Sequence, residues 1–265
     1  DEGRFADAIY WSTRTMGVDP DDHELPAFVA QYLLMLGLTE EAAPWVRRAE
    51  LLNASGSDTQ RVLIQYAERS GDSARALALS KEVLRAKRDN RRWVYGIAAI
   101  HYMALMDEAG KLDEALAYMD AVSPGMAKLP PPPPQSEFDL VVQSVAAGYL
   151  VRGADLAERK LRADGQRASL QKGAPDFDVE DDVFGAVLAE MGGERARAVE
   201  ILARELGDPG EAIWEWHVGV LRDPVLGPLT KEPEVAAAIA RMEANYAAQG
   251  ERYRKMVADG EIKVP

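Results

Sequence analysis

Apolar residues recur every three or four positions in a series of stretches, and glycines, prolines or polar clusters separate these stretches. Because this spacing places the apolar side chains on one face of a helix, each stretch predicts an amphipathic helix. The expected start and end of each helix follow from N-capping residues and from glycines and prolines that end a helix. The expected helices span 5–17, 25–36, 39–52, 58–70, 73–86, 91–109, 112–122, 138–151, 154–163, 179–191, 194–206, 209–221 and 234–258, with a polar loop over 165–178. We therefore expect an all-α fold.

A second pattern connects several of these helices: a glycine is followed five residues later by an alanine. The pairs are Gly3/Ala8, Gly37/Ala42, Gly71/Ala76, Gly110/Ala115 and Gly193/Ala198, and the first three glycines are 34 residues apart. A glycine in a tight turn between two helices can adopt a positive φ. An alanine allows the second helix to cross the first at close range. We expect repeated helix pairs with this register.

These Gly–Ala pairs, together with Pro20 in the first unit, resemble the tetratricopeptide repeat family. The resemblance implies a right-handed superhelical α-solenoid of helix-turn-helix repeats, in which the first helix of each pair lines a concave wall. The sequence departs from the family at Pro26 and Gln60, where a large aromatic residue is common. Spacing also widens after Gly110, so a degenerate unit is expected around Gly153.

The segment from Val220 onward resembles the end of long bacterial tetratricopeptide proteins that carry an N-terminal signalling domain. The chain also begins within a repeat, so we expect it to be part of a larger bacterial protein. The expected domains are repeats at 1–128, with the first repeat reduced to its second helix, a polyproline linker at 129–136, degenerate repeats at 137–206, and a terminal helix pair with a capping helix at 207–265.

Residues 130–134 are five consecutive prolines. A proline run cannot be α-helical and adopts the extended polyproline II conformation. Such a segment is either a stiff linker between repeats or an exposed ligand for an SH3-like or WW-like module. The linker is the interpretation that we favour.

The net charge of −13, from 44 acidic and 31 basic residues, argues against nucleic acid as a partner of this region. No cysteine is present, so the sequence offers neither disulfides nor thiolate metal ligands. The most apolar window, 140–151, is too short to cross a membrane, and no signal peptide is visible. The compartment stays open between bacterial cytoplasm and periplasm, as does the possibility of a homo-oligomer.

The sequence contains no recognisable catalytic motif. The three histidines, His23, His101 and His217, lack a second potential ligand at helical spacing. The acidic stretch at 176–182 lacks the glycine and the final glutamate that a calcium-binding EF-hand loop needs. We therefore expect no catalytic residues, no metal and no cofactor.

The register of the repeats predicts which side chains face a partner on the concave wall. The wall combines hydrogen-bonding and cationic groups with apolar ones. The candidate contact residues are Gln31, Leu34, Met35, Arg61, Gln65, Arg69, Ile97 and Ile100. A basic patch of Arg85, Arg88, Arg91 and Arg92 is either a site for an acidic peptide or phosphate, or a solvated helix end.

Two functions follow from these candidates. The first is a non-catalytic scaffold that binds a protein or peptide in its concave groove. The alternative is a regulatory region that senses a small molecule and controls an upstream output domain. An open groove would favour the scaffold, whereas enclosed, convergent polar groups would favour the sensor, and strongly perturbed titrating groups would favour an enzyme.

Overall fold

The computed structural model describes residues 3–86, 92–173, 182–207 and 222–265. In these residues the chain is helical and no strand is formed, which confirms the all-α class. Its elements are α1 (Phe5–Met16), α2 (Glu24–Met35), α3 (Thr39–Asn53), α4 (Ser57–Arg69), α5 (Ser73–Ala86), α6 (Arg92–Glu108), α7 (Leu112–Val122), α8 (Glu137–Leu150), α9 (Leu156–Gly173), α10 (Val183–Gly192), α11 (Arg195–Gly207), the 3₁₀ helix η1 (Gly227–Lys231) and α13 (Pro233–Ala258).

Helix α9 is the largest departure from the expected bounds. It continues to Gly173 through the segment that we expected to be a polar loop. Its continuation buries Gln166, Ser169 and Leu170, so tertiary packing supports a helix that its polar sequence does not predict. Helix α10 begins later than expected because Asp182 caps it, with its Oδ1 accepting the Gly185 N–H at 2.9 Å. The helix expected at 209–221 lies outside the described residues.

The turns that join the helix pairs share one geometry, as the glycine register predicts. Gly37, Gly71, Gly110 and Gly193 have φ values of 74°, 81°, 70° and 83°. In each turn the N–H of the next residue donates 2.8 Å to the carbonyl five residues earlier, which is the Schellman arrangement. Gly153, expected in the degenerate unit, also has a positive φ of 79°. The turn prediction is therefore confirmed.

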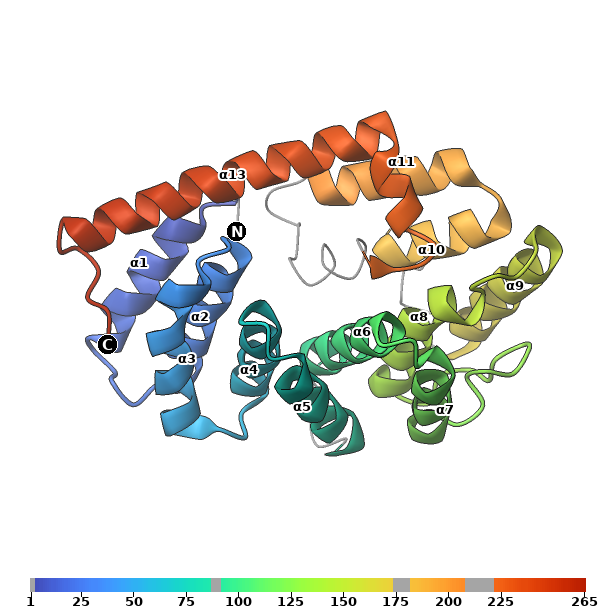
Figure 1. The fold of residues 1–265 in the computed structure, drawn as a ribbon, viewed down its shortest axis with the longest axis horizontal. Helices are drawn as coiled ribbons and strands as arrows, with labels where there is room; N and C mark the ends of the chain where they lie inside the picture. The colour runs from blue at the N-terminus through green and yellow to red at the C-terminus, as the bar shows by residue number, and fades with distance from the viewer. Residues whose placement is uncertain (1–2, 87–91, 174–181, 208–221) are drawn as a thin grey trace.

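The alanines of the register are packed where the helices of each pair cross. Ala42, Ala76, Ala115 and Ala198 are fully buried. Helices α2, α4, α6, α8 and α10 contact one another in turn and form one layer. Helices α3, α5 and α7 each contact the helix before and the helix after, and so form a second layer outside the first (Figure 1). The helix pairs are therefore stacked side by side along the chain.

The long helix α13 connects the two ends of this arrangement (Figure 1). Its first part packs with α11, where Val235 and Ala238 join the C-terminal core. Its second part packs with α1, where Met242, Tyr246 and Tyr253 join the N-terminal core. The helix has one buried stripe along its whole length. The stacked pairs are thus closed into a ring.

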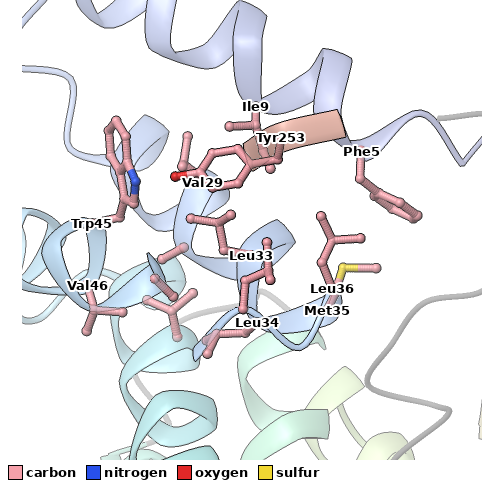
Figure 2. Packing of buried hydrophobic residues seen from close by; sticks show 14 of the residues in the cluster. Phe5, Ile9, Val29, Leu33, Leu34, Met35, Leu36, Trp45, Val46 and Tyr253 are labelled. Carbon is pink, nitrogen blue, oxygen red and sulfur yellow. The ribbon is translucent and has the colours of Figure 1, made fainter. Parts of the chain in front are cut away.

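Polar contacts add to the apolar packing at this closure. The Ala6 N–H donates to Gln249 Oε1 at 3.1 Å, and Asn245 donates to the Gly3 carbonyl at 3.2 Å. Arg252 pairs with Asp7 of α1. Figure 2 shows Tyr253 lying among the side chains of α1, α2 and α3. The closing helix therefore belongs to the N-terminal core and is not only a cover for the last repeat.

Candidate functional site

Most of the candidate concave-wall residues are covered in this structure. The buried ones come from α2, α4 and α6, and they are Gln31, Leu34, Met35, Arg61, Gln65, Ile97 and Ile100. Leu34 and Met35 belong to the same core as Met242 and Tyr246 of α13. Arg69 is the exception, since it is exposed at the end of α4. The wall therefore differs from the open groove that the resemblance implies.

Two of the four arginines of the basic patch lie outside the residues that the structure describes. Arg85 is exposed near the end of α5, and Arg92 begins α6, whereas Arg88 and Arg91 lie outside the described residues. The neighbouring Lys81 places its ammonium 5.6 Å from the ring centre of Tyr102, which is a cation–π distance. The prediction that this patch binds an anion stays a prediction.

Charged side chains from three separate segments meet on the inner side of the ring. Glu68 of α4 contacts both His101 of α6 and Arg222, which lies before η1. Arg222 also reaches Glu108, with 3.4 Å between its Nε and the carboxylate oxygen. We call Glu68, Arg69, His101, Glu108 and Arg222 the inner charged cluster.

Burial controls the charge of His101. Its withdrawal from water, and secondarily the positive charge of Arg222, lowers its pKa to about 3. The imidazole is therefore neutral near pH 7, and a proton on Nδ1 can be donated to Glu68. His101 is therefore a packed, neutral residue, and Glu68 and Arg222 form the charged pair.

Two further titrating groups lie beside Arg222. Burial raises the pKa of the Asp223 carboxyl to about 6, although the carboxylate accepts the N–H groups of Val225 at 2.7 Å and Leu226 at 2.9 Å. Burial, and then the nearby Asp223, raises the pKa of the Tyr149 hydroxyl. Gly148 of α8 lies directly against the Asp223 side chain, and the Tyr149 side chain is buried.

Arg69 and Glu108 are the exposed members of the cluster. Partial withdrawal from water, and then the positive charge of Arg222, lowers the pKa of the Arg69 guanidinium. Tyr246 of α13 acts in the opposite direction. An anion placed near Arg69 and Arg222 would offset the repulsion between the two guanidinium groups. The cluster therefore combines two guanidinium groups with two carboxylates in one polar surface.

Sequence reasoning placed Arg69 on the inner wall but missed the role of Arg222. In the sequence, Arg222 is part of an Arg-Asp-Pro helix breaker. Its contact with Glu68 joins positions 154 residues apart, and no local pattern indicates such a pairing. The ring closure that brings them together is a tertiary property.

No group of potential ligands suited to a metal ion is found among the described residues. Within the same ranges, no helix combines the length and the apolar character needed to cross a bilayer. No protein-family model, curated protein or solved structure matches this chain.

Proposed function

We propose that this chain is a non-catalytic sensory module, a closed tetratricopeptide-like solenoid within a larger bacterial protein, that binds a small anionic molecule at the inner charged cluster. The observation that carries the proposal is the convergence of charged groups from α4, α6 and the segment before η1. Convergent polar groups inside a closed fold are typical of small-ligand sites.

The position of the cluster gives ligand binding a structural consequence. Glu68 and Arg69 belong to the N-terminal half of the stack, whereas Arg222 leads into η1 and the closing helix α13. A carboxylate or phosphate that pairs with Arg69 and Arg222 would strengthen the link between the two halves. Binding would thus favour the closed ring over looser states, which is the requirement for regulating an attached output domain.

A thermal-shift screen of small carboxylates and phosphates tests this proposal. We expect at least one compound to raise the melting temperature in a saturable manner. The Arg69→Ala variant should lose that shift. Arg75→Ala is the matched control, because Arg75 is an exposed arginine that pairs with Glu50 on the outer helices. A shift that survives Arg69→Ala, or that Arg75→Ala removes equally, would reject the site.

Binding of a protein or peptide along the inner wall is the second candidate. The adjacency of α2, α4 and α6 favours it, because their amide and guanidinium groups could hydrogen-bond an extended chain. At the α2 end, however, Leu34 and Met35 share their core with Met242 and Tyr246 of α13, so a peptide that reached them would have to displace α13. Releasing Met242, Tyr246 and Tyr253 from the core costs roughly 5–9 kcal/mol, at about 1.5–3 kcal/mol for each buried side chain.

A peptide of micromolar affinity supplies only about 8 kcal/mol, so displacing α13 would consume most of its binding energy. This comparison is why we place the sensor first. A peptide array probed with the wild-type chain and with Tyr246→Ala separates the two functions. If peptides use the inner wall, Tyr246→Ala should bind them more tightly, because less packing has to be broken. Equal binding by both proteins, or none, would exclude this wall as the peptide site.

A further inference from the structure

The five-proline segment is docked against the protein along its length. Pro131 and Pro134 are buried, and the segment lies between α8 and α9. The Pro132 carbonyl accepts two hydrogen bonds, from Ser169 Oγ of α9 at 2.8 Å and from Gln143 Nε2 of α8 at 3.2 Å. The segment is therefore held from both sides.

Buried polar side chains are dedicated to this contact. Gln143 and Ser169 are each 3% exposed. Gln166, also buried, donates to Gln143 Oε1 at 3.4 Å and so helps to orient the amide that binds Pro132. A buried amide or hydroxyl is costly unless it is hydrogen-bonded. In this arrangement the backbone carbonyl of a proline, which is a strong acceptor, satisfies that requirement.

Small residues on α9 form a track for alternate prolines. A Cβ added at Gly165 would lie 3.2 Å from Pro130, and one added at Gly173 would lie 2.5 Å from Pro134. Together with Ser169 these positions recur every four residues and share one face of the helix. Pro130, Pro132 and Pro134 therefore meet every fourth residue of α9 in order.

The two repeats match in length. Two residues of polyproline II advance about 6.2 Å, at about 3.1 Å for each residue. Four residues of an α-helix advance about 6.0 Å, at 1.5 Å for each residue. An extended proline segment parallel to α9 therefore stays in register with the track over all three contacts.

We propose that the face of α9 formed by Gly165, Ser169 and Gly173, together with Gln143 of α8, is a docking site for a polyproline II segment, and that residues 130–134 occupy it as an internal ligand. The groove selects its occupant in two ways. Gly165, Ser169 and Gly173 set the spacing of the prolines that fit, and Ser169 and Gln143 both donate to the carbonyl of the central proline. Residues 130–134 are consequently not presented to an SH3-like or WW-like module. Occupation of the groove fixes α8 relative to α9.

A peptide-binding experiment in trans tests the groove. In one variant the segment is replaced by Pro130→Gly, Pro131→Ser, Pro132→Gly, Pro133→Ser and Pro134→Gly, which leaves the groove empty. The probe is a labelled synthetic peptide of residues 129–135, followed by fluorescence anisotropy. We expect saturable binding to this variant, at least tenfold weaker binding to the wild-type chain, and loss of binding when Ser169→Leu is added. Equal binding to all three proteins, or none to the folded variant, would overturn the proposal.

A double-mutant cycle provides a second measurement if the replaced segment unfolds the chain near 37 °C. Gly173→Ala should lower the denaturation midpoint of the wild-type chain, because its new Cβ collides with Pro134. Combined with Pro134→Gly, the same substitution should lose only part of that effect, because the ring atoms at 2.5 and 2.8 Å are removed while the Pro134 carbonyl oxygen at 2.7 Å remains. An identical loss in both backgrounds would show that the Pro134 ring does not pack against Gly173.

Discussion

Gly71 provides a test of the repeat register in which packing plays no part. Its φ is 81°, and a Cβ added there would meet no atom within 4 Å. The cost of Gly71→Ala is therefore conformational. An L-residue in the left-handed region costs about 1–2 kcal/mol. The alanine recovers about 0.4–1 kcal/mol by restricting the unfolded chain.

The net expectation is that Gly71→Ala lowers the free energy of unfolding by about 0.5–1.5 kcal/mol. Gly96 is the matched control. It lies inside α6 with helical φ, and an added Cβ would be in ordinary contact with Val141 at 3.7 Å. Gly96→Ala should therefore stabilise by about 0.5–1 kcal/mol. The same substitution is thus expected to have opposite signs at the two positions.

Equilibrium urea denaturation followed by circular dichroism measures both differences. Because Gly37, Gly71 and Gly110 are in separate turns, their alanine substitutions should add, to roughly 1.5–4.5 kcal/mol for the triple variant. If Gly71→Ala were neutral, or if Gly71→Ala and Gly96→Ala shifted stability in the same direction, the turn would not need its left-handed glycine and the register would be refuted.

Three further substitutions probe other parts of the structure. Ala76→Leu should destabilise by about 1–3 kcal/mol in thermal or urea unfolding, because Ala76 is fully buried at a helix crossing; an unchanged midpoint would contradict the close crossing. Tyr246→Ala should destabilise by about 3–5 kcal/mol, because it removes a buried ring from the closure of the N-terminal core, whereas a loss below about 1 kcal/mol would mean that α13 is only loosely attached. Burial raises the pKa of Asp223 to about 6 from 3.8, so the folded chain keeps a proton that the unfolded chain releases, and this stabilisation is present below about pH 3.8 and is lost as pH rises through 6. Asp223→Asn cannot ionise and should gain up to about 3 kcal/mol relative to wild type between about pH 4 and 7, and a stability difference that does not vary with pH would reject the buried carboxyl.

The helix pairs and their turns could be predicted because their determinants are local. The glycine at each turn and the alanine five residues later act on neighbouring residues, so Gly37, Gly71 and Gly110 are where the pattern places them. The end of α9 could not be predicted in this way. Its last turns are polar, and burial of Ser169 and Leu170 by distant segments decides their conformation.

The candidate site was predicted only in part, because ring closure is a long-range property. The register placed Arg69 on the inner wall, but it also implied that Gln31 and Gln65 would face an open groove. The amphipathic stripe of α13 indicates that it packs on something, without saying that it packs on both ends of the chain. Arg222 reaches Glu68 only as a result of that packing.

Closure of the ring by α13 is the central claim, and a cross-linking measurement tests it directly. The chain has no cysteine, so paired cysteines can be introduced without background. Asp7→Cys with Arg252→Cys replaces the ion pair between α1 and α13. Asp7→Cys with Glu234→Cys is the control, since positions 234 and 252 are about 27 Å apart along the helix. We predict that a short bis-maleimide joins the first pair within one chain and leaves the second pair unjoined; equal reaction of both pairs, or failure of the first, would contradict the closed ring.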